Sequence, residues 1–290
     1  MVNFESIRAL INLMDDPDEN IYSHVHDRLL SYGADAIPFL ENSWEDQDFG
    51  LLFQSRIETI IHEIQFEEIR RKLTNWIASS DKDLLTGSII IAKYQYPGLD
   101  ESAIRGQIET LQKDVWLEIN QKQTALEKVR IINKVFFGLH HFQGNAKTFH
   151  SPLNSYINTV LETKKGNPLS LSIIYSIIAQ NLGMPIYGIN LPNHFILAYM
   201  DEFAVNQYIP DSNTHGVLFY INAFSKGSIF DQDEIKEFLD GINQPYLRDY
   251  FEPCSNTAII NRMITNLISS FQEVGNSEKV NELIELRGLF

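Results

Sequence analysis

The segment GNPLSLSIIYSIIAQNLG, residues 166–183, decides the fold of this chain. Its apolar residues cover nearly every side of an α-helix, which is typical of a helix that is buried all round. Pro168 stands in the first turn, where a proline is tolerated, and Leu182-Gly183 ends the helix. The segment therefore predicts the central buried helix of a globular core.

Three short apolar runs, at residues 186–191, 195–199 and 217–221, follow this helix. They are rich in β-branched and aromatic residues, which favour strands. One buried helix against a small antiparallel sheet makes an α+β core. Turn residues lie at Pro192-Asn193, Pro210-Asp211 and Lys226-Gly227.

The first 145 residues are predicted to form a series of helices. Apolar positions recur there at helical spacing, and acidic turns near Asp18, Asp48 and Asp81 interrupt them every 30 to 33 residues. This spacing lies at the edge of the range of helical repeats, and residues 17–44 resemble a degenerate HEAT repeat. Stacked repeats leave an extended surface that commonly binds other proteins. An irregular all-helical domain without true repeats fits the sequence equally well.

The chain ends in a pattern typical of an αα-hairpin. Residues 256–286 contain two amphipathic helices with Gly275-Asn276 at their junction. A polar loop at residues 143–151 separates the N-terminal helices from the core. We therefore expect a predominantly helical α+β protein. Its parts are a HEAT-like helical domain (1–145), a transglutaminase-like α+β core justified below (146–250) and a C-terminal αα-hairpin (251–290).

The charge of the chain limits the classes of partner that are expected. The sequence has 23 Lys and Arg against 38 Asp and Glu, a formal net charge of −15. Residues 1–69 alone hold fifteen acidic and three basic residues, a net charge of −12. An acidic chain without a basic patch repels phosphate, so neither nucleic acid nor an anionic membrane is an expected partner. A protein partner is expected, and a basic one would associate fastest. No oligomeric state follows from the sequence.

The sequence also indicates a compartment. The single cysteine, Cys254, cannot form an internal disulfide, which fits a reducing environment. The first residues show no signal-peptide pattern, and no run approaches the ~18 apolar residues of a membrane span. The protein is therefore expected to be cytoplasmic.

Histidines are the main candidates for metal ligands. His24 and His26, and likewise His140 and His141, point to different sides of a helix, and His62 is remote from both pairs in sequence. The sequence contains no His-Glu-x-x-His spacing and no glycine-rich phosphate loop. We expect no metal ion and no other cofactor.

The core also resembles a known family, over about a quarter of the chain between Phe149 and Gly227. The residues that carry the resemblance are Asn154-Ser155, Val160-Leu161, Gly166, Pro168, Ser170-Leu171, Tyr175, Leu182-Gly183, Pro185, Pro192 and His194-Phe195. With them the chain resembles the SirB-type transglutaminase-like family, a bacterial branch of the transglutaminase and papain-like superfamily. The resemblance implies an N-terminal helical region and often a C-terminal helical pair.

The resemblance also implies where a catalytic site would lie. Active members of the superfamily carry a Cys at the start of the central helix, a His on a following strand and an Asp on the next strand. The helix dipole and the His activate the thiol, and the Asp orients the imidazole. Aligned with them, this chain has Pro168 at the nucleophile position, His194 at the His position and Asn222 at the Asp position. Proline has no nucleophile, and an Asn cannot stabilise an imidazolium by charge.

Part of this pattern is shared with the SirB-type family and part departs from it. The family usually has proline at the start of the helix. Asn222-Ala223 in place of Asp-Pro, and Asn193 in place of the glycine that commonly precedes the His, are departures. No residue is therefore assigned as catalytic, and His194, Asn222 and Ser170 are relict candidates.

Three functions remain open. The leading hypothesis is a non-catalytic transglutaminase-like protein that acts as a protein–protein interaction or regulatory module. The alternative is an amide or ester hydrolase, or an acyltransferase, with an unusual nucleophile near His194, for which Ser170 is the candidate. The third is a ligand site without turnover.

Each candidate residue also has a structural interpretation. His194 can be a core histidine that is hydrogen-bonded to backbone. Ser170 and Ser172 can be tolerated in the buried helix because their hydroxyls bond to the preceding turn. Cys254 has the wrong position for the superfamily nucleophile, and only sensitivity to oxidation is predicted for it.

Overall fold

The computed structural model describes residues 4–44, 50–201 and 216–290. Contacts divide the chain into two compact units. The first comprises Met1–Asn75 with Lys93–Pro97, and the second comprises Trp76–Ala92 with Gly98–Phe290. We call them the N-terminal unit and the core unit. The three domains predicted above, with boundaries after residues 145 and 250, stay a prediction, because a unit defined by contacts need not fold independently.

The N-terminal unit contains the first part of the 28-residue helix α4 (Leu51–Ala78) and three shorter helices. Asp18 caps the second of these, since its side chain accepts a hydrogen bond from Asn20 N at 2.8 Å, as its acidic turn predicted. The turns predicted at Asp48 and at Pro210-Asp211 lie outside the described residues. The HEAT-like nature of this region stays a prediction. The shorter elements are α1 (Phe4–Asn12), η1 (Leu13–Asp15), α2 (Glu19–Tyr32), η2 (Gly33–Ala36) and α3 (Ile37–Trp44).

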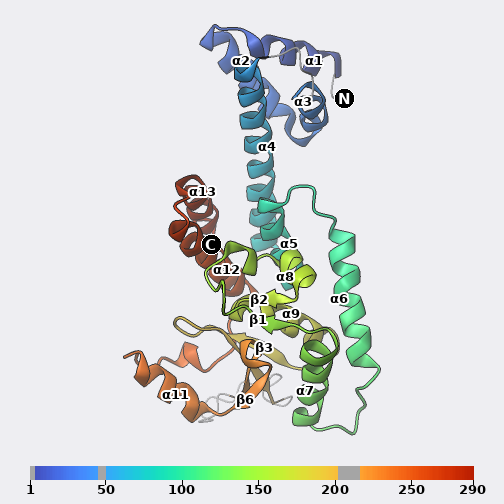
Figure 1. Cartoon of the computed structure of the whole chain (residues 1–290), viewed down its shortest axis with the longest axis vertical. Helices are drawn as coiled ribbons and strands as arrows, with labels where there is room; N and C mark the ends of the chain where they lie inside the picture. The colour runs from blue at the N-terminus through green and yellow to red at the C-terminus, as the bar shows by residue number, and fades with distance from the viewer. Residues whose placement is uncertain (1–3, 45–49, 202–215) are drawn as a thin grey trace. The chain divides into compact units, whose positions relative to one another are not determined.

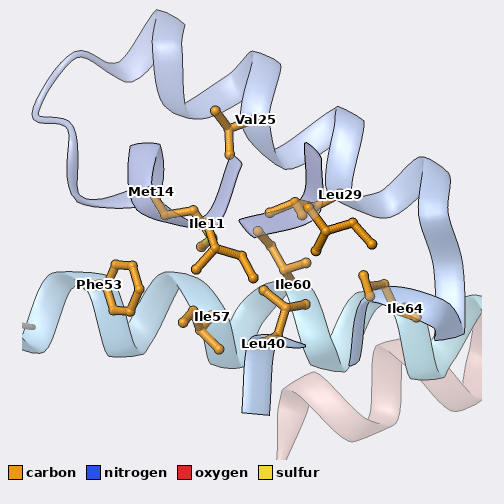
Figure 2. Packing of buried hydrophobic residues seen from close by; sticks show 11 residues of the cluster. Ile11, Met14, Val25, Leu29, Leu40, Phe53, Ile57, Ile60 and Ile64 are labelled. Atoms are coloured by element: carbon orange, nitrogen blue, oxygen red, sulfur yellow. The ribbon is translucent and has the colours of Figure 1, made fainter. Parts of the chain in front are cut away.

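Apolar residues at helical spacing hold this unit together. Phe53, Ile57, Ile60 and Ile64 recur every three or four residues and lie on one face of α4. Figure 2 shows these side chains facing residues of the shorter helices, among them Leu29. Burial of each large apolar side chain is worth about 1.5–3 kcal/mol. The face of α4 therefore organises the packing of the shorter helices.

The core unit is built around the helix that the segment 166–183 predicted. This helix is α9 (Pro168–Asn181), and every residue from Pro168 to Ala179 is buried. The predicted strands are confirmed as β3 (Ile186–Ile189), β4 (Ile196–Met200) and β5 (Val217–Asn222). A further strand, β6 (Ser228–Phe230), was not predicted, because only the turn before it has a clear sequence signal. The strands pair antiparallel in chain order.

The sheet is covered on both faces, so all five residues of β4 are buried. Ile196 and Ala198 belong to an apolar cluster with Ile235 and Leu239 of α11 (Gln232–Gly241). Residues between them, such as Leu197, point to the opposite face, where α9 contacts the strand. Figure 1 shows α9 and α11 beside this sheet. The predominantly helical α+β fold is thus confirmed.

Further helices complete the core unit. The predicted C-terminal hairpin is confirmed as α12 (Asn256–Glu273) and α13 (Ser277–Arg287), which contact each other and are joined through Gly275 at φ 74° (Figure 1). α12 also contacts α9. None of the helices in the described ranges is long and apolar enough to span a membrane. The remaining elements are α5 (Leu84–Gln95), α6 (Glu101–Trp116), α7 (Ala125–Asn133), the π-helical η3 (Lys134–Leu139), β1 (Gln143–Gly144), η4 (Pro152–Asn154), α8 (Ile157–Thr163), β2 (Lys165–Gly166), η5 (Ala223–Ser225) and η6 (Arg248–Tyr250).

Candidate functional site

The first turn of α9 is fixed by two side chains that cap each other's backbone. Asn167 Oδ1 accepts a hydrogen bond from Ser170 N at 2.8 Å, and Ser170 Oγ accepts one from Asn167 N at 3.0 Å. This reciprocal pair is a capping box. Pro168 occupies the first helical position, where its missing N–H leaves no acceptor unsatisfied. The capped turn thereby holds the proline ring in place.

The Ser170 hydroxyl is engaged in this cap and in the layer behind it. Its Oγ donates to Asn154 O at 2.6 Å and lies 3.3 Å from Asn167 O in the preceding turn. Ser170 is 3% exposed and does not line the cavity described below. The Oγ of Ser172 has no hydrogen-bond partner among the described residues. The expectation that both hydroxyls bond to the preceding turn is therefore wrong for Ser172, which is fully buried.

His194 is presented by the turn between β3 and β4. Asn193 has φ 57°, in the left-handed region that glycine and asparagine tolerate best. This explains the residue before the His, since Asn serves the same backbone conformation as the glycine that commonly stands there. The departure noted in the sequence thus preserves the turn. His194 N donates to Leu191 O at 3.4 Å, which closes it.

His194 and Asn222 lie together, as the resemblance implied. Asn222 Nδ2 lies 3.1 Å from His194 Nε2. The Oδ1 of the same amide accepts hydrogen bonds from Phe224 N and Ser225 N, at 3.1 and 3.2 Å, and so caps η5. These two bonds orient the amide with its NH₂ toward the ring. Nε2 must then be an acceptor, so the neutral imidazole carries its proton on Nδ1.

The environment of His194 also favours the neutral ring. Burial lowers the pKa of His194, and the nearby charge of Arg262 lowers it further. No described residue forms a hydrogen bond with Nδ1. The side chain is partly buried, and its partner is Asn222 and not a backbone atom, in contrast to the simple core histidine considered above.

A cavity of about 360 Å³ lies between the start of α9, the turn before β4 and α12. Pro168 and Leu169 line it from α9, and His194 and Phe195 line it from the turn. Two of the three aligned positions therefore share one cavity, and Asn222 is joined to it through the His194 ring. The sequence had not singled out Arg262, which lines the cavity from α12. A signal existed, because Arg262 is the first charged residue in a helix whose next is Glu273.

Cys254 lies outside the lining of this cavity. Its backbone N donates to Gly188 O at 2.8 Å, which ties the segment before α12 to β3. Burial raises the pKa of its thiol to about 12, although the charge of Arg262 acts in the opposite direction. The thiol is therefore protonated at neutral pH, when it is a poor nucleophile.

Three of the histidines considered as metal ligands have other partners. His24 Nδ1 lies 2.7 Å from Asn20 O, His26 Nε2 lies 3.0 Å from a Glu63 oxygen, and His140 Nε2 lies 2.8 Å from an Asp114 oxygen. Within the described ranges, no group of three or more His, Cys, Asp or Glu side chains is placed to hold a metal ion.

Comparison with known proteins gives a family match over most of the core unit. A family model described as "Transglutaminase-like superfamily" matches residues 102–265, which is more than half of the chain. The matched range contains Pro168, His194, Asn222 and Arg262. No solved structure gives a significant match.

Relatives come from bacteria and from animals. The UPF0162 protein of Xylella fastidiosa is 25% identical over 214 residues, which are 71% of this chain and 72% of that protein. F-box only protein 21 of Homo sapiens is 24% identical over 269 residues, 82% of this chain but only 40% of that protein. A UPF0162 protein of Pasteurella multocida is 32% identical over 98 residues, 34% of this chain and 37% of that protein.

Proposed function

This chain belongs to the transglutaminase-like superfamily, and we propose that it uses the fold without catalysis, as a protein–protein interaction or regulatory module. Within the superfamily we propose the SirB-type family, a bacterial branch in which proline usually begins the central helix. We further propose that the protein is cytoplasmic and binds neither nucleic acid nor membranes, since its net charge is −15.

Pro168 is the observation that carries this proposal. Its ring stands at the first position of α9 and lines the same cavity as His194. Covalent catalysis of this class needs a thiol or hydroxyl within hydrogen-bond reach of the base. No described hydroxyl or thiol forms a hydrogen bond with the His194 ring, whose side-chain partner is Asn222. Among the described residues, this base therefore has no hydrogen-bonded nucleophile to activate.

The alternative is an amide or ester hydrolase, or an acyltransferase, with an unusual nucleophile. The observation in its favour is the His194–Asn222 pair, which keeps the arrangement of a base and its orienting residue. Ser170 is a poor nucleophile for it, because its proton is donated to Asn154 O and its residue is buried away from the cavity.

An activity assay separates these two functions. The full chain and His194→Ala would be compared for incorporation of a fluorescent amine into casein and for hydrolysis of p-nitrophenyl acetate. We expect no difference between the two proteins, because neither holds an activated nucleophile. Turnover that disappears in His194→Ala would refute the non-catalytic function.

Restoring a thiol tests whether Pro168 occupies the nucleophile position. In Pro168→Cys the new thiol would lie at the positive end of α9 and beside the imidazole, and both effects lower a thiol pKa. The pH dependence of its alkylation should therefore have a lower midpoint than that of Ser277→Cys, which places a thiol at the exposed first position of α13. Equal midpoints would argue against the assigned position.

A basic protein is the partner that we propose, and the N-terminal unit offers a place for it. A groove of about 440 Å³ is lined by Glu41, Glu58 and Trp44, among others. Trp44 Nε1 donates to Glu58 Oε1 at 3.0 Å, and the Trp side chain is 42% exposed. Carboxylates beside an aromatic ring fit a Lys or Arg side chain.

Charge reversal in the groove tests this partner. Glu41→Lys/Glu58→Lys should lose proteins that the unchanged chain captures, because like charges would face a basic partner. Glu278→Lys/Glu285→Lys, on α13, is the matched control, since it makes the same change of charge outside the groove. Identical sets of captured proteins for all three chains would contradict the groove as the docking site.

A further inference from the structure

The cavity beside Pro168 differs in charge from the rest of the chain. The chain carries a net charge of −15, yet the described residues that line the cavity include an arginine and no Asp or Glu. At its rim, the exposed His150 contacts Glu273, with Nδ1 3.0 Å from a carboxylate oxygen. The interior of the cavity is therefore positive within an acidic protein.

Arg262 supplies the positive charge and is held in one orientation. Its Nη1 donates to Asn190 Oδ1 at 3.0 Å and to Leu191 O at 3.3 Å, and its Nε donates to Asn266 Oδ1 at 3.2 Å. All three acceptors are neutral. Nη2 forms no hydrogen bond with a described residue, and no described carboxylate forms an ion pair with this guanidinium. A partly buried cation without a counter-charge is costly, so the site favours an anion.

The His194 ring supplies a second donor. Because Asn222 Nδ2 donates to Nε2, the neutral ring carries its proton on Nδ1. Nδ1 has no hydrogen-bond partner among the described residues, and the ring lines the cavity together with Arg262. The same amide contact that removes the basic lone pair of Nε2 thus leaves an N–H for a ligand.

The rest of the lining combines an apolar part with the polar side chains of Asn167, Asn193, Asn266, Ser269 and Ser270. Phe149, Pro168, Leu169 and Phe195 line the cavity, and the N-terminus of the 14-residue helix α9 adds the positive end of its dipole. No lysine and no second arginine are among the described lining residues. One cation fits the single charge of a carboxylate better than the double charge of a phosphate. A guanidinium also suits the planar carboxylate by geometry.

We propose that this cavity binds a carboxylate carried on a small apolar body, with Arg262 Nη2 and His194 Nδ1–H as the donors. The inference rests on the proposed non-catalytic function, because the bound molecule is held where a nucleophile would otherwise attack it. The carboxylate can belong to a free organic acid or to the C-terminus of a peptide. Both sources share the chemistry that the cavity recognises.

Calorimetric titration of the full chain tests the proposal with matched acids and amides. The probes are hexanoate against hexanamide, and the peptide Ala-Ala-Leu against its C-terminal amide. Each acid pairs with the guanidinium and each amide does not, so at least one acid should bind about tenfold more tightly than its amide. The pair with the larger ratio identifies the source. Equal binding of acid and amide in both pairs overturns the proposal.

Variants locate the site. Arg262→Gln should abolish the preference for the acid, whereas Arg130→Gln, at an exposed arginine of α7, should keep it. Because Arg262 also anchors the turn at Asn190, a second variant leaves the arginine in place. Ser269→Trp fills the cavity from an exposed position on α12, and Gln272→Trp is its control on the same helix outside the lining. An acid preference that survives both Arg262→Gln and Ser269→Trp would place binding elsewhere and overturn the proposal.

Chromatography of the same samples separates this inference from the proposed function. Intact probes with a preference for the acid support both. Intact probes without that preference overturn the carboxylate site and leave the non-catalytic function standing. Consumption of the peptide amide that depends on His194 refutes the non-catalytic function, whereas the acid preference still decides the carboxylate site.

Discussion

Each unit of the molecule holds a buried or partly buried arginine, and the two differ in whether residues of the chain satisfy the guanidinium charge. In the N-terminal unit, Arg56 is 6% exposed, and its Nη1 donates to Met14 O at 2.7 Å and to Asp16 O at 2.8 Å. Its Nη2 donates to Glu19 Oε1 at 2.9 Å, and the guanidinium lies 4.1 Å from the centre of the Tyr22 ring. The chain itself therefore satisfies this cation.

Arg262 of the core unit lacks a counter-charge of this kind. Its acceptors are neutral, one of its nitrogens has no partner in the described part of the chain, and it lines a cavity. The difference shows that burial of an arginine does not by itself identify a site. A missing counter-charge next to open space is what distinguishes a binding group from a structural one.

The largest expected effect is the loss of stability on replacing Arg56, whose charge is satisfied within the chain. Arg56→Met keeps the apolar stem but leaves two carbonyls without their donor, so the free energy of unfolding of the N-terminal unit should fall by about 2–4 kcal/mol. Glu19→Gln should lower it by only about 1 kcal/mol or less, because Glu19 is 79% exposed. Urea unfolding with hydrogen exchange measures both. Similar losses in the two variants would show that the carbonyl contacts contribute little.

The second effect concerns the protonation of His194, whose Nδ1–H tautomer supplies a donor in the proposed carboxylate site. Burial, and then the charge of Arg262, hold the pKa of His194 below its usual 6.5 in the folded protein. The unfolded chain therefore binds a proton first, so this group lowers stability as pH falls below 6.5 toward the folded pKa.

Asn222→Asp should reverse that sign. A carboxylate still caps η5, but it accepts a hydrogen bond from Nε2–H and stabilises the imidazolium, so the pKa of His194 should rise by about 1–3 units. Titration of the ring by NMR measures the pKa, and its nitrogen shifts report the move of the proton from Nδ1 to Nε2. A proton on Nε2 in the unchanged chain would contradict the amide orientation described here, and an unchanged pKa in Asn222→Asp would show that the new carboxylate does not contact the ring.

A third change gives Arg262 a counter-charge within the chain. Asn266→Asp places a carboxylate next to Arg262 Nε, where the amide oxygen now lies at 3.2 Å. Because the cation then has an internal partner, the acid that the unchanged chain prefers, hexanoate or Ala-Ala-Leu, should bind about tenfold more weakly, whereas stability should change by about 1 kcal/mol or less. Gln272→Glu adds the same charge to α12 outside the cavity and should leave binding nearly unchanged. Equal losses in the two variants would indicate a general effect of charge.

The smallest effect is expected at Cys254. Burial raises the pKa of its thiol to about 12, so at about pH 8 only roughly one molecule in ten thousand carries the thiolate. Alkylation by iodoacetamide, followed by intact mass, should be far slower than that of free cysteine. The charge of Arg262 favours the thiolate, so Arg262→Gln should slow labelling a little further. A rate in the variant that exceeds the original would show local opening.

Sequence patterns predicted the main buried helix and strands well, because apolar periodicity is a property of short segments of sequence. The segment 166–183 became α9, the three strands appeared where apolar runs were found, and the hairpin turned at Gly275. The helix α11, the π-helical stretch Lys134–Leu139 and the strands β1, β2 and β6 were not predicted. These three strands are only two or three residues long, which is too short for a periodic pattern.

The candidate site was predicted less completely. The resemblance brought Pro168, His194 and Asn222 to attention, and the structure places the first two in one cavity and bonds the third to the second. Arg262 was missed because it comes from α12, 68 residues after His194 in sequence. Long-range approach of this kind depends on how the hairpin packs, which no local pattern encodes.

The two bonds from Asn222 Oδ1 to Phe224 N and Ser225 N have a consequence for the history of the site. They give this side chain a reason to persist that is independent of any reaction, because the turn after β5 needs its cap. A protein that abandoned chemistry would still be selected to keep an Asn or Asp there. The presence of a His–Asn pair that resembles a catalytic pair is therefore weak evidence of activity. Because an Asp would cap the same turn, a return to an acid at this position would be a short evolutionary step.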